Sequence, residues 1–150
     1  MLKKIQAFFS EAETDATDDE AALHLAAAIL LVEVAKSDHS LEASEIERMK
    51  VVLQRDWHVD DADLEDLMEV ARDTSDHHVS LHAQIDLVNR NFTVRQKFNL
   101  IRGLWQVACA DGTIHHHEEL LVRRLADLLY VSHTDFIRSK HLALGEQDDL

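Results

Sequence analysis

The sequence predicts an all-α fold, a compact bundle of seven to eight helices in two pseudo-symmetric halves. Three observations lead to this class. The 150 residues include no proline and only three glycines, so few chain breaks are specified. Apolar residues recur at helical spacing along most of the chain, and the alternation typical of strands is absent. One stretch also occurs twice, each time between an apolar helix and a charged one.

The N-terminal part contains a short amphipathic pattern and then the most apolar segment of the chain. A helix is expected over residues 2–10, docked on the core by its apolar face. The next helix, over about residues 19–36, is hydrophobic almost all round, which is typical of a helix at the centre of a bundle. Glu33 lies near the end of this apolar helix, and a buried carboxylate needs a partner.

The later helices follow from the same periodicity. They are expected over about 43–56, from Asp60 or Asp61 to about 73, from Asp76 past Val88, over about 94–109 and 116–131, and from Ser132 or His133 to about 142. Thr93 and Gln96 form a predicted capping box at the start of the 94–109 helix. All belong to one domain spanning residues 1–150, with the internal repeat at about 19–73 and 93–142 and a frayed tail after Gly145.

The repeated stretch reads AKSDHSLEASE over residues 35–45 and ACADGTIHHHE over residues 108–118. Both copies place a small residue before an aspartate, an isoleucine or leucine three positions after it, and a glutamate seven positions after it. The register persists into the flanking helices, which indicates two structural repeats within one fold.

Charge and composition narrow the classes of partner. The chain has 29 acidic and 15 basic residues, a net charge of −14, which disfavours binding to nucleic acid or anionic lipid. A single cysteine, Cys109, excludes an intramolecular disulfide framework. The apolar run at residues 7–9 is too short for a signal peptide, and no stretch is long enough to span a membrane, so the cytoplasm is the expected location.

One interpretation of the repeated loops is purely structural. In the second copy His115 would be the N-cap of the next helix, Glu118 would close a capping box at N3, and Ile114 would supply an apolar staple. Glu42 and Glu45 would have the cap and N3 roles in the first copy. On this interpretation the motif starts two helices and has no chemistry.

The other interpretation is a divalent metal site. If the two halves pack about a pseudo-twofold axis, the repeated carboxylates could converge, and oxygen donors of this kind suit Mg²⁺ or Ca²⁺. Nearby imidazoles would widen the choice to Mn²⁺ or Zn²⁺. The candidate ligands are Asp38, Glu45, Asp111 and Glu118, with His39 and His115 as weaker candidates. An EF-hand is excluded, because its closing glutamate comes eleven residues after the first aspartate.

No catalytic motif is present: a glycine-rich phosphate loop, HExxH and GxSxG are all missing from the sequence. The chain is therefore expected not to be an enzyme. A hydrolase built on a two-metal carboxylate site stays as the less favoured alternative.

At these motifs the chain resembles the tellurite resistance protein TerB family. The likeness is carried by AxxDHxLxxxE at residues 35–45, by AxxDGxIxxxE at residues 108–118 and by the opening MLKKIQAFF, and it covers about residues 1–140. The resemblance implies a fold of about seven helices, an acidic cluster that binds divalent metal, and an association with bacterial stress and metalloid resistance. His39 stands where the family usually has glycine, which makes it an additional candidate ligand.

These observations lead to an expected function. The chain should be a cytoplasmic, non-enzymatic TerB-like domain that binds a divalent cation at the paired acidic loops and acts on a protein partner as an adaptor or sensor. The alternative is an interaction module without metal, whose repeated loops only cap helices.

Overall fold

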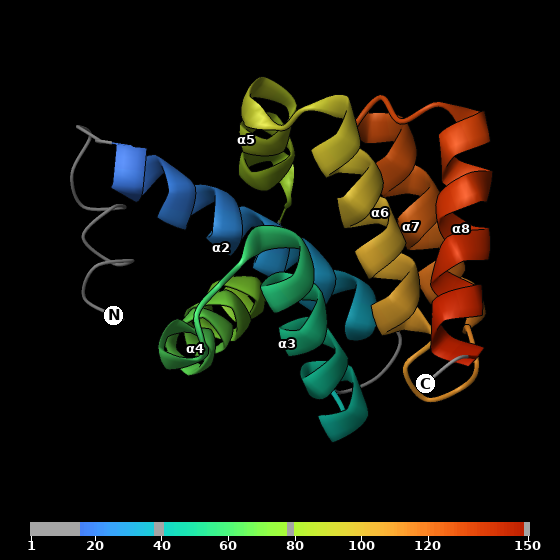
Figure 1. Ribbon diagram of the computed structural model, residues 1–150, viewed down its shortest axis with the longest axis horizontal. Coiled ribbons are helices and arrows are strands. Elements are labelled where there is room, and N and C mark those ends of the chain that lie inside the picture. Colours follow the sequence, from blue (N-terminus) through green and yellow to red (C-terminus); the bar gives the residue numbers. More distant parts are fainter. Residues whose placement is uncertain (1–15, 38–40, 78–79, 149–150) are drawn as a thin grey trace.

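The computed structural model describes residues 16–37, 41–77 and 80–148, and these form seven helices and no strand (Figure 1). The expected helix over residues 2–10 lies outside the described residues. The seven helices are α2 (Ala16–Ala35), α3 (Ala43–Trp57), α4 (Asp61–His77), α5 (His82–Asn91), α6 (Val94–Ala108), α7 (His116–Leu128) and α8 (His133–Asp148). The all-α class predicted from helical periodicity is confirmed.

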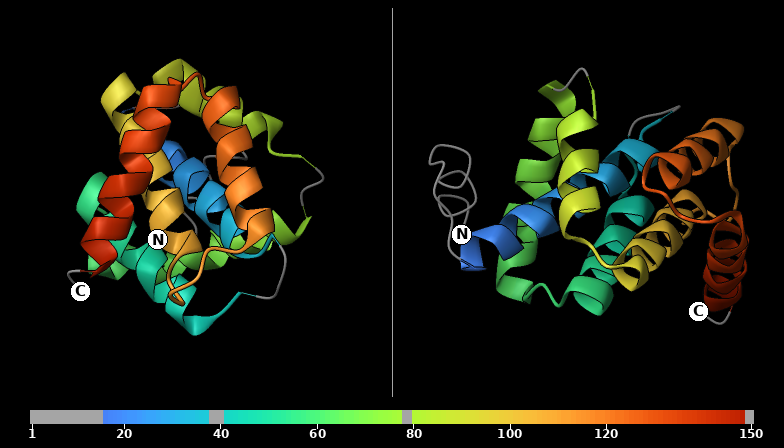
Figure 2. Two further views of the ribbon diagram at one scale, coloured as in Figure 1. Left: turned by 90° about the vertical axis from the view of Figure 1, so that its right-hand side faces the viewer. Right: turned by 90° about the horizontal axis from the view of Figure 1, so that it is seen from above.

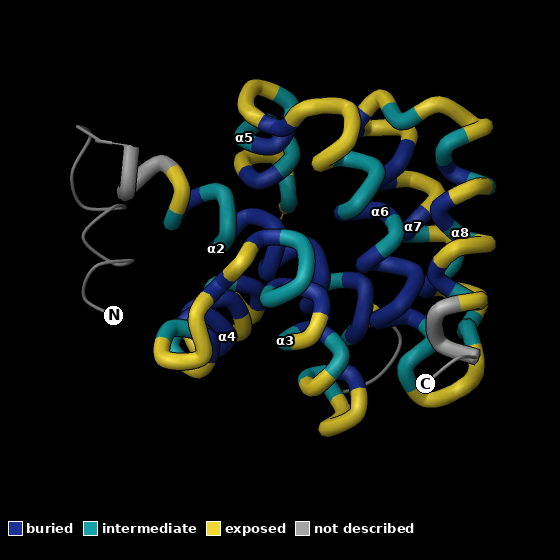
Figure 3. Tube along the Cα trace, in the orientation of Figure 1, coloured by how far each residue is buried: buried dark blue, intermediate teal, exposed yellow. Residues whose placement is uncertain are grey.

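α2 lies at the centre of the bundle, as its uniformly apolar sequence predicts. It contacts α3, α4, α5, α6 and α7, and the views in Figure 2 show these helices arranged around it. Every residue from Leu25 to Ala35 is buried except Glu33. Figure 3 shows the same distribution along the trace, with buried positions concentrated on α2 and α6 and exposed positions on the outer helices.

The contacts between helices follow the sequence repeat. α2 packs against α3 and α4, and α6 packs against α7 and α8, while α2 and α6 contact each other. The two described non-glycine residues with positive φ are His58, at 54°, and Tyr130, at 59°. They follow α3 and α7 and are 72 residues apart, one residue less than the offset of 73 between the two copies of the repeated stretch. The two halves therefore share turn geometry as well as helix order.

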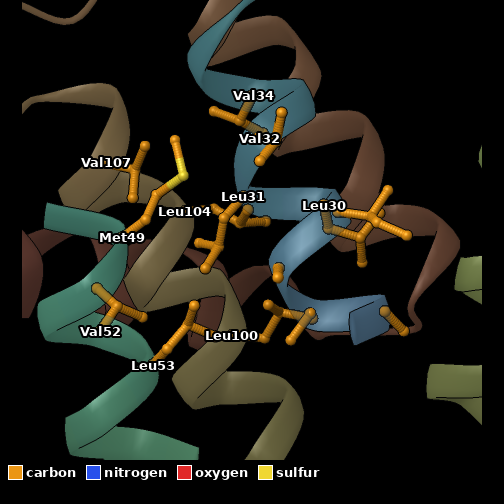
Figure 4. Close-up of a cluster of buried hydrophobic side chains, with 14 of the residues drawn as sticks. Leu30, Leu31, Val32, Val34, Met49, Val52, Leu53, Leu100, Leu104 and Val107 are labelled. Atoms are coloured by element: carbon orange, nitrogen blue, oxygen red, sulfur yellow. The ribbon is translucent and has the colours of Figure 1, made fainter. Parts of the chain in front are cut away.

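The core forms where α2, α3 and α6 meet. Figure 4 shows side chains from the three helices directed toward one another, among them Met49, Val52 and Leu53 of α3 and Leu100, Leu104 and Val107 of α6. All are fully buried. Gly103 of α6 permits this close approach, because a Cβ at this position would lie 2.6 Å from Cγ1 of Val52.

Glu33 has the partner that its apolar surroundings require. Its carboxylate accepts a hydrogen bond from the Ser75 hydroxyl of α4 and lies 3.8 Å from Nζ of Lys36. Lys36 also forms an ion pair with Asp76 at 3.1 Å. These contacts tie the end of α2 to the end of α4.

Three helix boundaries differ clearly from the prediction, namely the end of α4, the start of α5 and the end of α8. We expected α4 to end near residue 73 and a new helix to begin at Asp76, but α4 continues to His77 and α5 begins at His82. The contacts of Ser75 and Asp76 with α2 stabilise this extra turn, and periodicity along one helix cannot reveal them. α8 likewise continues to Asp148 rather than ending near residue 142, since Gly145 is accommodated within the helix.

The boundaries around the repeated loops agree with the prediction more closely. α3 begins after the predicted cap Glu42, and α7 begins after His115. Thr93 and Gln96 form the predicted capping box at the start of α6, with Gln96 N–H donating to Thr93 Oγ1 at 3.1 Å. Within the described ranges, no helix is long and apolar enough to cross a lipid bilayer.

His24 couples the stability of the bundle to pH. Its side chain on α2 is 19% exposed, and burial lowers its pKa below that of an exposed histidine, against the opposing effects of Glu20 and Asp63. The folded state then binds a proton less readily than the unfolded state, whose histidine titrates near pH 6.5. The contribution of neutral His24 to the free energy of unfolding is fully present above that pH. It declines as the pH falls toward the pKa of His24 in the folded state.

We therefore expect His24→Gln to lose less stability than the parent between about pH 7.5 and about pH 5.5. Urea unfolding at both pH values measures the difference. His77→Gln serves as the comparison, because the backbone carbonyl of Asp73 raises the pKa of that exposed histidine. An identical pH dependence in the parent and His24→Gln would contradict the assignment.

Candidate functional site

The second acidic loop joins α6 to α7 through a tight turn. Cys109 ends α6, and Gly112 N–H donates to the carbonyl of Cys109 at 2.9 Å. Gly112 has a φ of +92°, a conformation that side chains with a Cβ rarely adopt, so glycine at this position is required by the turn. The turn places Asp111 on the surface, one residue before the glycine.

Asp111 is held in place by the loop itself. Its Oδ1 accepts a hydrogen bond from Thr113 N–H at 3.0 Å, and its Oδ2 lies 3.3 Å from Nε2 of His115. The Thr113 N–H makes the largest contribution to lowering the pKa of Asp111, with a smaller contribution from His115. The side chain is 31% exposed, so an ionised carboxylate in a defined orientation faces solvent beside an imidazole.

The glutamates of both loops close capping boxes, as the structural interpretation predicts. Glu45 accepts a hydrogen bond from the N–H of Glu42 at 2.9 Å, and Glu118 accepts one from the N–H of His115 at 3.3 Å. Glu45 is 2% exposed and Glu118 is fully buried. Both carboxylates thus lie beneath the loops and stabilise the first turns of α3 and α7.

The candidate ligands are only partly brought together. Asp111 and His115 lie side by side at the surface, whereas Glu45 and Glu118 are buried in their own caps. Asp38 and His39 lie outside the described residues. Across residues 16–37, 41–77 and 80–148, no group of three or more histidine, cysteine, aspartate or glutamate side chains is arranged to hold a metal ion.

The helices that precede the two loops nevertheless lie together. α2 and α6, which lead into the two loops, contact each other and end on the same side of the molecule (Figures 1 and 2). The carboxylate and imidazole of the second loop suit Mn²⁺ or Zn²⁺, and further carboxylates would suit Ca²⁺ or Mg²⁺. The donor chemistry of Asp111 and His115 therefore fits a divalent cation that takes its remaining ligands from outside this loop.

The structure also contains a polar cluster that sequence analysis missed. Asp56 at the end of α3 binds Arg55 through two hydrogen bonds of 2.9 Å and Arg102 of α6 at 3.0 Å. Arg55 also donates to the buried Gln106 at 2.7 Å. The signal was present in the sequence, because residue 56 continues the apolar series of Met49 on α3 at helical spacing.

The structure has a groove between α3 and α4. It is lined by Ile46, Lys50, Glu65, Met68, Glu69, Arg72, Asp73 and Asp76, and none of the four candidate carboxylates contributes to it. A metal-dependent hydrolase would need an open cleft beside those carboxylates. This groove therefore adds no support to that alternative.

Comparison with known proteins matches the chain to a protein family. A family model described as tellurite resistance protein TerB matches residues 24–141. The matched span runs from α2 into α8 and includes both acidic loops. No curated protein and no solved structure matches the chain.

Proposed function

The chain belongs to the TerB family of tellurite resistance proteins, and from this premise we propose that it is a cytoplasmic, non-enzymatic adaptor or sensor in a bacterial stress response. It would bind a divalent cation at the acidic loops, and the bound cation would change its contact with a protein partner. The family match supports the association with tellurite resistance; the cation and the partner are our proposals.

The observation that carries the proposal is the state of Asp111. Its carboxylate is ionised, exposed and held by Thr113 and His115 before any ligand arrives. Pre-ordered donors bind more tightly, because little conformational freedom is lost on binding. The surrounding protein has a net charge of −14, which attracts cations to its surface.

A bound cation would act here as a fixed positive charge between the two halves. Asp111 and His115 would hold it on the second loop, and Asp38 and His39 are the candidates on the first. The carboxylate of Glu45 is engaged in the cap of α3 and would support the first loop. Glu118 would support the site by fixing the start of α7, since its carboxylate is engaged in the cap. Because α2 and α6 contact each other, an ion held by both loops would bias the relative position of the two halves.

The experiment is thermal unfolding of tag-free protein stripped with EDTA and titrated separately with Mg²⁺, Ca²⁺, Mn²⁺ and Zn²⁺. An ion that binds only the folded state adds about 1.4 kcal/mol at ten times its dissociation constant. We expect a saturable rise in Tm with one of these ions and loss of the rise in Asp111→Asn. Asp127→Asn, which removes an exposed carboxylate elsewhere, should respond like the parent.

The second candidate is an interaction module without metal, and the burial of Glu45 and Glu118 in capping boxes favours it. It predicts no rise in Tm with any of the four ions. Under either proposal Glu118→Ala should destabilise the fold by about 0.5–2 kcal/mol, because a cap is lost. The ion titration therefore distinguishes the two proposals, whereas the stability of Glu118→Ala does not.

A further inference from the structure

The groove between α3 and α4 has the features of a docking site for an elongated ligand. Its volume is about 440 Å³, and its walls come from two helices that contact each other little along their length. Ile46 of α3 and Met68 of α4 supply its apolar surface; Met68 is buried and Ile46 partly so. Figure 1 shows α3 and α4 beside one another on the outside of the bundle.

The α4 wall of this groove is strongly acidic. Seven of the 17 residues of α4 are aspartate or glutamate, and one is arginine. Four of the acids line the groove together with that arginine, Arg72; the acids are Glu65, Glu69, Asp73 and Asp76. They follow one another at spacings of four, four and three residues, which places them in a row along one helix face.

Two lysines of the chain already bind the ends of this row. Lys50 reaches across from α3, forms an ion pair with Glu65, and lies 3.7 Å from Glu47. The hydrogen bond with Glu65 raises the pKa of Lys50. Lys36 forms an ion pair with Asp76 at the other end, at 3.1 Å. Ammonium groups therefore find partners at both ends of the acidic wall.

We propose that the α3–α4 groove binds a basic amphipathic helix from another protein, with lysine or arginine side chains directed to the acidic wall of α4 and apolar side chains directed to Ile46 and Met68. Charge complementarity selects this occupant. An acidic peptide or a nucleic acid would bring like charge against the row of carboxylates.

The length of the row sets the size of the occupant. Glu65 and Asp76 are eleven residues apart on α4, a distance of about 16 Å along a helix. A partner helix of about three turns would cover the row. Such a helix could place a cation opposite Glu69 and Asp73, the two central acids, while its apolar face lies on the floor of the groove.

The test uses a fluorescein-labelled synthetic peptide of about twelve residues, with lysines on one helical face and leucines on the other. Fluorescence anisotropy in EDTA should show saturable binding that weakens steeply as salt is added. Glu69→Lys should weaken it roughly tenfold, because an attraction becomes a repulsion. Asp127→Lys, an equal charge reversal at an exposed position on α7, should change it less than about twofold.

A second variant tests the site independently of any loss of folding. Lys50→Met keeps most of the aliphatic stem but removes the ammonium group that forms the ion pair with Glu65. We expect the peptide to bind this variant a few-fold more tightly, since Glu65 is released. Amide and methyl chemical shifts should change at Ile46 and Met68 rather than over the whole acidic surface.

Equal weakening by Glu69→Lys and Asp127→Lys, or shift changes spread over all helices, would overturn the proposal in favour of general attraction to an acidic protein. Weaker binding to Lys50→Met would overturn it as well. Because the titration is done in EDTA, its result does not depend on cation binding at the loops. If the peptide does not bind the groove, the proposed cation site is unaffected. If no ion binds the loops, the proposed peptide site is likewise unaffected.

Discussion

Asp56→Ala should lower the free energy of unfolding by about 3 kcal/mol, the largest effect we expect from a single charged residue in this protein. The Asp56 side chain is 4% exposed and is the shared acceptor of Arg55 and Arg102. Removing it takes away the carboxylate that both guanidinium groups share as an acceptor. Arg55 is 33% exposed, so water can solvate its guanidinium group and offset part of the loss. The expected loss in the free energy of unfolding is therefore near the lower end of the range for breaking a buried ion pair.

The measurement is urea unfolding of Asp56→Ala beside Asp127→Ala. Asp127 is an exposed aspartate near the end of α7, as Asp56 is near the end of α3, and its removal should cost less than about 0.5 kcal/mol. Similar midpoints for the two variants would mean that the Asp56 cluster contributes little net stability. Asp56→Asn should fall between the parent and Asp56→Ala, since an amide oxygen still accepts hydrogen bonds.

Gly103→Ala should destabilise the protein by about 2 kcal/mol, although alanine is the better helix former. The added Cβ would lie 2.6 Å from Cγ1 of Val52, in the core where α6 meets α3. Val52 is fully buried and cannot move aside without disturbing its neighbours. The cost of overpacking therefore exceeds the gain in helix propensity, which is about 1 kcal/mol.

Gly145→Ala provides the matched control, because Gly145 also lies within a helix. A Cβ at this position meets no atom within 4 Å, so the substitution should stabilise α8 by up to about 1 kcal/mol. The opposite signs of the two Gly→Ala changes are the expected result, measured as midpoints of thermal unfolding. A stabilised Gly103→Ala would show that α3 can move away from α6 at little cost.

Local patterns predicted much of the fold correctly. The uniformly apolar segment that includes Leu25 to Ala35 was expected to be central, and it is the helix with the most neighbours. The capping boxes at Glu42, Thr93 and His115 were also predicted. Each of these depends on residues within one or two helical turns, so the information is contained in a short stretch of sequence.

The candidate site was only partly predictable. The spacing of seven residues between Asp111 and Glu118 suggested two carboxylates directed toward one ion, but the fold buries Glu118 in a cap and leaves Asp111 outside with His115. Burial depends on which helices cover the first turn of α7, and the spacing of two acids along the chain does not contain that information.

The sequence by itself determined the helical class, the duplication, the central helix and the capped starts of α3 and α7, because these follow from periodicity and from residues close together in the chain. Only the tertiary structure decided the features that join distant positions. These are the extended end of α4, held by Ser75 on Glu33, the Asp56 cluster with Arg102, the contact of Gly103 with Val52, and the acidic groove of α4. Each joins residues that lie far apart in sequence, and their pairing depends on how whole helices pack rather than on any local pattern.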